Sequence, residues 1–225
     1  MKLKPLAMTI VAGGLFAAAG PSSAVLCSAV PTLSAWSALG AAGCVDPDSD
    51  STWVFGSVTG AVPLTTSFTL TELEFAGGDV YNVAFSFAPP LTTAAGQGWA
   101  ISYTATSNAT QMFTAANYDT GVTEPVNGSG AVSTAHVTGT GLNLTLTSTD
   151  GSHAPPPSGE TPFAGLLNIA VTDTFVTIPA GIVYNSANNS FQTGTPARAP
   201  EPISLALVGV ALAGMGLVRR KRKLT

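Results

Sequence analysis

Positive charge is almost absent from the long central part of the chain. Of the eight lysine and arginine residues, only Arg198 lies between residues 25 and 201. All twelve acidic residues fall in that same span, so one cation against twelve anions gives it a formal net charge of −11. Because such a surface cannot neutralise phosphates, nucleic acid is excluded as a partner.

Histidine is scarce as well, which limits the chemistry that the chain can perform. Only His136 and His153 are present, and the sequence has no Gly-x-Ser-x-Gly elbow that would place a serine nucleophile beside either of them. Phosphoryl transfer lacks both a glycine-rich phosphate loop and a lysine in the central span. We therefore expect no catalytic residues and no cofactor, with both histidines as ordinary strand or loop residues.

What the central span has in abundance is β-type sequence, rich in Thr, Ser, Gly, Asn and Ala with apolar residues spread among them. Apolar and polar residues alternate with a period of two in residues 80–87, 99–104 and 142–147. The alternation changes phase near Thr71, which predicts a bulge or turn there, and it changes again after Val171. Gly-Gly, Pro-Pro, Asn-Gly and Asp-Gly pairs mark turns between the segments.

These patterns predict an all-β domain over residues 25–198, folded as an antiparallel β-sandwich of seven to ten short strands. A jelly roll is one topology that remains open. Trp53, Trp99 and Tyr118 lie in or beside alternating segments. We expect them to pack in the core rather than to serve as exposed platforms for sugar rings.

Residues 1–24 have the features of a secretory signal peptide. Two lysines precede an apolar stretch, and small residues before Val25 mark a cleavage site that makes Val25 the mature N-terminus. Cleavage after Ala19 is the second possibility. An uncleaved membrane anchor is disfavoured because the apolar stretch is short and ends at Pro21.

The two cysteines, Cys27 and Cys44, follow this segment. An even number of cysteines in an exported chain predicts a disulfide, and two thiols without a neighbouring histidine make a poor zinc site. Between them, Thr32 can cap a short helix that Gly40 ends, so we expect a disulfide-closed helical segment. Lipidation of Cys27 is disfavoured because Leu26, rather than a small residue, precedes it.

Three aspartates after Cys44 resemble the start of a calcium loop. Asp46, Asp48 and Asp50 have the spacing of its first three ligands. The positions where such a loop carries glycine and glutamate are occupied by Ser51 and Ser57, so a solvated acidic loop is favoured and we assign no metal site.

Glu72 and Glu74 form a second acidic pair. Residues two apart lie on one face of a strand, about 6.5–7 Å from each other. This separation suits the two carboxylates of an inverting glycosidase. Paired acids on a solvent-facing strand are far more common, so the enzyme interpretation is disfavoured.

The end of the chain combines three features. Pro200, Glu201 and Pro202 come first, and the apolar stretch 203–218 follows. The chain then carries a basic cluster of Arg219, Arg220, Lys221, Arg222 and Lys223. The apolar stretch predicts a single transmembrane helix about 24 Å long. The basic cluster stays in the cytoplasm, which places the central span outside.

This order resembles the PEP-CTERM sorting signal of Gram-negative bacteria, in which Pro-Glu-Pro precedes a glycine-containing apolar helix and an arginine-rich end. The resemblance covers residues 199–225. It implies that an exosortase, a membrane cysteine protease, cuts near Pro200-Glu201-Pro202 and then releases or transfers the body. It also implies a connection with exopolysaccharide, biofilm and the cell envelope.

We therefore predict an exported, non-catalytic protein of the cell envelope or the exopolysaccharide matrix, with a structural or adhesive role. Its expected partners are an exosortase, the membrane through residues 203–218 before processing, and exopolysaccharide. The first alternative is a carbohydrate-binding module of the extracellular matrix. A secreted glycoside hydrolase is a more distant one.

Overall fold

The computed structural model describes most of the central span. The described residues are 24–48, 50–75, 77–92, 98–107, 110–123, 132–149, 152–153, 160–176 and 183–194. Of the predicted signal peptide only Ala24 is among them. The predicted sorting tail, residues 199–225, lies outside the described residues.

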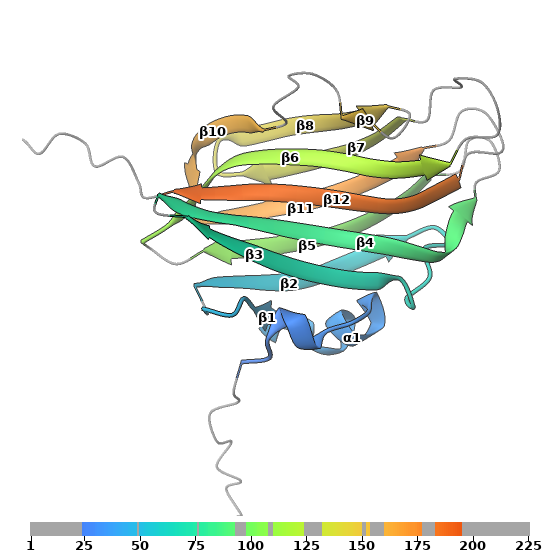
Figure 1. Ribbon diagram of the computed structural model, residues 1–225, viewed down its shortest axis with the longest axis horizontal. Helices are drawn as coiled ribbons and strands as arrows, with labels where there is room; N and C mark the ends of the chain where they lie inside the picture. The colour runs from blue at the N-terminus through green and yellow to red at the C-terminus, as the bar shows by residue number, and fades with distance from the viewer. Residues whose placement is uncertain are drawn as a thin grey trace, which may run out of the picture.

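Two antiparallel sheets face each other and account for most of this part of the chain (Figure 1). One sheet has seven strands in the order β1-β2-β5-β11-β7-β8-β9. In this order they are β1 (Cys44–Val45), β2 (Ser51–Thr59), β5 (Gly98–Ser107), β11 (Asn168–Val176), β7 (Val132–Gly139), β8 (Leu142–Thr149) and β9 (Ser152–His153). The five-stranded sheet consists of β10 (Thr161–Leu166), β6 (Met112–Thr123), β12 (Val183–Gly194), β4 (Gly78–Thr92) and β3 (Ser67–Phe75).

The all-β class with two antiparallel sheets agrees with the sequence prediction, whereas the number of strands differs. The described residues form twelve strands rather than seven to ten. β1 and β9 have only two residues each, which is too short for alternation to reveal them. A seven-plus-five arrangement also differs from the eight-stranded double Greek key of a jelly roll.

The core lies between the sheets and is built from the apolar residues that alternate along the strands. Trp53 on β2 is completely buried, and its indole contacts four rings contributed by both sheets: Tyr81, Tyr103, Phe113 and Phe191. Trp99 and Tyr118 are also buried. The predicted core packing of these aromatic residues is therefore confirmed.

The segment between the cysteines lies along one edge of the sheets (Figure 1). It contains η1 (Cys27–Ala29), α1 (Leu33–Ala38) and η2 (Gly40–Ala42), and a disulfide joins Cys27 to Cys44. The Thr32 side chain accepts a hydrogen bond from the Ala35 N–H at 3.2 Å, as expected of a cap.

Trp36 connects this segment to both sheets. Its ring stacks on Phe68 of β3 with a centroid distance of 4.0 Å, and its Nε1 donates to the Trp53 carbonyl of β2 at 3.1 Å. The side chain of Trp36 is completely buried. The disulfide-closed segment therefore covers the core along the edge formed by β2 and β3.

Candidate functional site

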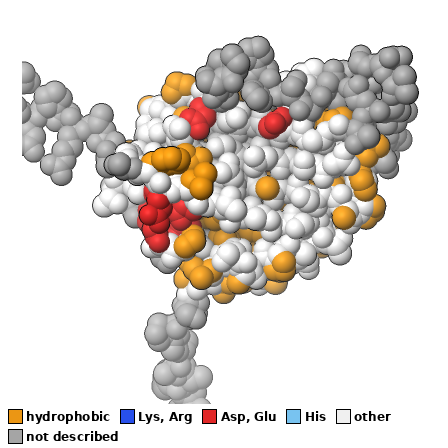
Figure 2. Space-filling view, viewed as in Figure 1, with side chains coloured by type: hydrophobic (Ala, Val, Ile, Leu, Met, Phe, Trp, Pro, Cys, Tyr) orange, Lys and Arg blue, Asp and Glu red, His pale blue; other side chains and the backbone are white. Residues whose placement is uncertain are grey.

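Six acidic residues gather at one end of the molecule, which we call the acidic end (Figure 2). The chain segment between β1 and β2 contributes Asp46, Asp48 and Asp50, and the neighbouring β3–β4 hairpin contributes Glu72, Glu74 and Asp79. This clustering follows from the register of β3.

β3 pairs with β4 without interruption from Ser67↔Ser86 to Phe75↔Gly78. The predicted bulge or turn near Thr71 is therefore wrong. Because the strand stays regular, the positions that hold Phe68 and Leu70 over the core are continued by Glu72 and Glu74, while Leu73 and Phe75 turn outward and are 55% and 61% exposed. The phase change in the sequence therefore marks the point at which one face of a regular strand changes from apolar to acidic residues.

Asp46 organises the loop that leads into β2. Its carboxylate accepts hydrogen bonds from the Asp50 N–H at 3.0 Å, from the Ser51 N–H at 2.9 Å and from the Ser51 hydroxyl at 2.6 Å. Trp53 Nε1 in turn donates to the Ser51 hydroxyl. Asp46 is completely buried, so the favoured interpretation of a solvated loop does not apply to this residue.

Asp50 and Glu72 lie against Asp46 in an environment that disfavours their charged forms. One carboxylate oxygen from each of the three residues lies within 4.8 Å of the others. Burial, with a further contribution from Asp46, raises the pKa of Asp50 to about 6, although the Tyr81 hydroxyl donates to it at 2.6 Å. Burial and repulsion from Asp46 and Asp50 raise the pKa of Glu72 to about 7.

Asp48 takes a different partner from the one its spacing predicts. It interacts with Glu74, and repulsion from Asp48 is the main cause of the raised pKa of Glu74. A hollow of about 450 Å³ lies here, lined by Asp48, Asp50, Glu74, Phe75, Asp79 and Gln111. The structure thus joins Asp46 and Asp50 to Glu72, and it joins Asp48 to Glu74.

The residues that the structure describes contain neither lysine nor arginine, so no side-chain cation of these types balances the acidic end. Three carboxylates at such distances are oxygen ligands of the kind that Ca²⁺ binds. An acidic cluster is also common without an ion. The sequence assigned no metal site here, and calcium stays the weaker alternative, for which the structure offers Glu72 rather than Asp48 as the third oxygen donor.

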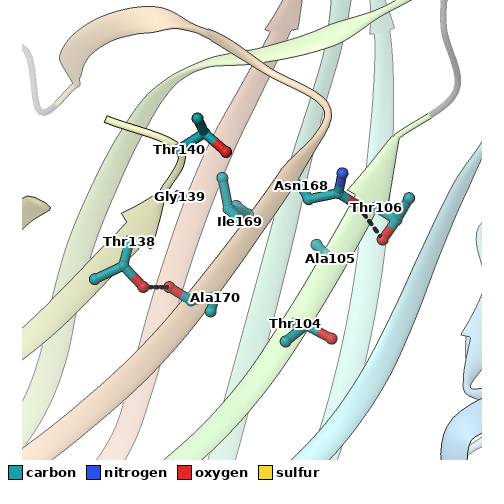
Figure 3. Close-up of a pocket in the computed structure, with 9 residues that line it drawn as sticks. All are labelled: Thr104, Ala105, Thr106, Thr138, Gly139, Thr140, Asn168, Ile169 and Ala170. Carbon is teal, nitrogen blue, oxygen red and sulfur yellow. Dashed lines mark hydrogen bonds between the residues drawn. The ribbon is translucent and has the colours of Figure 1, made fainter. Parts of the chain in front are cut away.

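A different kind of surface covers the outer face of the seven-stranded sheet. The outward residues of β5, β11, β7 and β8 are mostly threonine, serine, asparagine or alanine, with Val132 and His136 on β7 among the exceptions. A groove of about 480 Å³ crosses β5, β11 and β7 on this face (Figure 3). Its rim carries Thr104, Thr106, Thr138, Thr140 and Asn168, and Ala170 forms part of its floor.

His136 is the histidine whose side chain the structure describes. His136 is exposed on β7, and its Nε2 shares a hydrogen bond with the Asn143 side-chain oxygen, which is an amide and not a nucleophile. His153 lies in β9 rather than in the expected loop.

One ionisable residue that the sequence analysis missed lies in the centre of the core. Asp173 on β11 is completely buried, and the Asn189 amide donates to it across the sheets at 2.7 Å. Burial raises the pKa of Asp173 to about 8. Its other carboxylate oxygen has no hydrogen-bond partner. Strict alternation along Ile169, Val171, Asp173 and Phe175 is the signal that places it inside.

The last described strand ends at the acidic end. β12 ends at Gly194, and Thr193 beside it is hydrogen-bonded to Asp79. Residues 198–223, just beyond, match the model of the PEP-CTERM protein-sorting motif. The chain carries a PEP-CTERM sorting motif. The match includes the predicted Pro200-Glu201-Pro202 and the basic cluster 219–223.

A PEP-CTERM motif indicates a protein that is exported and sorted by an exosortase to the surface of a Gram-negative bacterium. No curated protein matches the chain. Among the described residues, no helix is both long and apolar enough to span a membrane. The predicted transmembrane helix 203–218 lies outside them.

Proposed function

We propose that the body of this PEP-CTERM protein is a non-catalytic structural or adhesive component of the cell surface, held in the exopolysaccharide matrix after an exosortase has processed the tail. The observation that carries this proposal is the separation of charge from the sheet faces. The outward residues of the seven-stranded sheet are mostly neutral hydroxyl and amide groups, whereas six of the nine acidic residues that the structure describes gather at the acidic end. Such a body can contact a hydrated polymer over a large area without ion pairs.

The core supports a scaffold role. Completely buried aromatic residues from both sheets contact Trp53, and the disulfide-closed segment covers an edge of this core through Trp36. A disulfide across a loop of this separation, 17 residues, contributes about 3 kcal/mol in the chain-entropy account. A protein exposed outside the cell benefits from both contributions.

The geometry of Glu72 argues against glycoside hydrolysis. A general acid must reach the glycosidic oxygen of the substrate. Oε1 of Glu72 is buried and has no hydrogen-bond partner, and the nearest acidic oxygens belong to Asp46 and Asp50 within the same cluster. The raised pKa of Glu72 therefore follows from burial and crowding of like charges and does not require a catalytic role.

The test combines localisation with activity. We expect the processed protein in the surface or matrix fraction of its host, and we expect no turnover when it is incubated with panels of chromogenic glycoside, ester and peptide substrates. Turnover that disappears when Glu72 and Glu74 are replaced with glutamine contradicts the non-catalytic role. Recovery of the protein only from the periplasm contradicts the matrix assignment.

The carbohydrate-binding alternative is supported by the groove on the seven-stranded sheet, which has the size of a ligand site and a polar rim. A glycan array separates the two functions. A binding module retains one short oligosaccharide at a single site, whereas a structural matrix protein shows no selective signal for a short oligosaccharide.

A further inference from the structure

The groove across β5, β11 and β7 is lined by uncharged residues only. We propose that it binds an uncharged, polyhydroxylated polymer, a neutral polysaccharide, which lies across the outer face of the seven-stranded sheet. This inference rests on the proposed location in a polysaccharide matrix, and it names the contact surface and the class of polymer.

The chemistry of the rim points to hydroxyl groups as the ligand. The Thr106 hydroxyl donates to the Asn168 side-chain oxygen at 2.8 Å, which orients the amide so that its NH₂ group faces outward as a donor. The Thr138 hydroxyl donates to the Ala170 carbonyl at 3.3 Å and keeps its lone pairs for accepting (Figure 3). The rim therefore offers donors and acceptors side by side, as sugar hydroxyls require.

The floor explains why the surface is hollow at this place. Ala170 pairs with Thr104 on one side and with Thr138 on the other, so a single methyl group stands between two longer side chains. The Ala170 methyl group adds a small apolar patch between Thr104 and Thr138. A sugar ring has the same division, with hydroxyl groups at its edge and C–H bonds on its faces.

The charge distribution selects a neutral polymer over a charged one. None of the residues that line the groove is ionisable, so a charged group bound there would lose water without gaining an ion pair. The central span has a net charge of −11, which repels polyanions. A polycation would be drawn to the acidic end instead, because the lining of the groove carries no carboxylate.

The polar pattern continues beyond the groove, which favours a long ligand. On β11, Thr172 and Thr174 follow Ala170 at outward positions, and the Thr172 hydroxyl lies 3.5 Å from that of Ser102 on β5. Without an aromatic platform in the groove, each contact is weak. A polymer that makes many such contacts is retained through multivalency.

The test is affinity electrophoresis of the exported, processed protein in gels that contain dextran or hydroxyethyl cellulose as neutral polymers, or alginate as an anionic one. We expect retardation in a neutral gel only. Ala170→Leu fills the floor and should weaken the apparent affinity about tenfold or more. The matched control is Ala84→Leu, because Ala84 is also half-buried and lies between two strands on the other sheet, beside Thr69 and Asn188.

Thr104→Val provides a second variant, since it keeps the shape of an exposed side chain and removes one hydroxyl. Thr104→Val should reduce retardation, and it tests the groove even if Ala170→Leu fails to fold. Equal retardation in alginate, no retardation in either neutral gel, or full retardation of both variants overturns the proposal. Self-association that Ala170→Leu abolishes also overturns it, because the face is then an interface between copies.

The outcome is distinguishable from failure of the proposed function. If the groove does not bind polymer, the wild-type protein and Ala170→Leu should still be processed and recovered at the cell surface to the same extent. If the protein never reaches the matrix, its location is wrong whatever the gels show.

Discussion

The Thr193 hydroxyl accepts a hydrogen bond from the backbone N–H of Asp79 at 2.9 Å, which ties the last strand to the start of β4. The same hydroxyl donates its proton either to the Asp79 carbonyl at 3.2 Å or to the Gln111 side-chain oxygen at 2.5 Å. Thr193 is buried, and the sorting motif begins a few residues later. The end of β12, the last described strand, is therefore held next to the acidic end.

Replacing Thr193 with valine tests this connection. The variant keeps the shape of the side chain but leaves the buried Asp79 N–H without its acceptor, so we expect a loss of about 1–2 kcal/mol in the free energy of unfolding. Denaturant titration measures it. Thr145→Val, on the exposed face of β8, is the control and should change stability by less than about 0.5 kcal/mol. Equal effects of the two variants contradict the assignment.

The disulfide makes a chemical prediction. Protein purified without reductant should not react with a thiol reagent after unfolding, and it should release two thiols only after reduction. Replacing Cys27 and Cys44 together with alanine should lower the free energy of unfolding by about 3 kcal/mol. Two reactive thiols in the unfolded, unreduced protein contradict the bond.

The buried carboxyl of Asp173 predicts that stability falls as the pH rises. Its pKa is raised from 3.8 to about 8 by burial, so the folded protein holds a proton that the unfolded chain has lost at intermediate pH. The contribution of protonated Asp173 to the free energy of unfolding is therefore fully present below about pH 4 and is lost as the pH rises to about 8. Each unit of pKa difference corresponds to about 1.4 kcal/mol, so the loss amounts to several kcal/mol. Thermal unfolding from pH 4 to 9 measures this slope.

Asp173→Asn supplies the comparison for that pH dependence. The amide keeps an oxygen that can accept from Asn189 and cannot ionise. The variant should show a flatter profile between pH 4 and 8 and should be more stable than wild type at pH 8. An unchanged slope shows that Asp173 is not the group responsible.

Glu72 at the acidic end predicts an effect of the same sign and smaller size. Burial and repulsion raise its pKa from 4.5 to about 7, so the folded protein loses stability as the pH rises from about 4.5 to about 7. Glu72→Gln should stabilise the protein at pH 8 in the presence of a chelator, on the order of 1 kcal/mol after allowance for solvent screening. The same variant at pH 4 is the internal control and should have no effect.

Bound calcium would reverse the effect of the Glu72 charge on stability. If the oxygens of Asp46, Asp50 and Glu72 bind Ca²⁺, millimolar calcium should raise the unfolding temperature of the wild type at pH 8, and Glu72→Gln should abolish that increase. An unfolding temperature that calcium leaves unchanged removes the calcium hypothesis for this cluster.

The sequence predicted the regular part of the fold because alternation reports directly on which side of a strand faces the core. β4 and β5 follow their predicted pattern, with Tyr81, Phe85 and Ile101 among the buried residues. In β3 the rule that apolar residues face the core fails after Leu70. Leu73 and Phe75 are exposed, and the face that carries Phe68 and Leu70 continues with Glu72, which is half-buried, and Glu74, which is exposed.

The composition of the acidic end was visible in the sequence, but its pairing was not. Local spacing grouped Asp46 with Asp48, whereas the partner of Asp46 and Asp50 is Glu72, which only the packing of β3 beside the preceding loop brings near. Asp173 was missed because an aspartate in an otherwise apolar strand looks like a break in the alternation. The groove depends on strand register, which no single segment reveals.

The most direct test of the account is the C-terminus of the mature protein in its native host, determined by mass spectrometry. Export followed by exosortase processing predicts that the protein ends near Pro200-Glu201-Pro202 and that a longer, membrane-bound form accumulates in cells without the exosortase. Replacing these three residues with alanine should trap the longer form and leave export intact, since an extended segment with few backbone donors is no longer presented to the protease. A mature protein that still ends at Thr225 in the native host contradicts the account and makes residues 203–218 a permanent anchor.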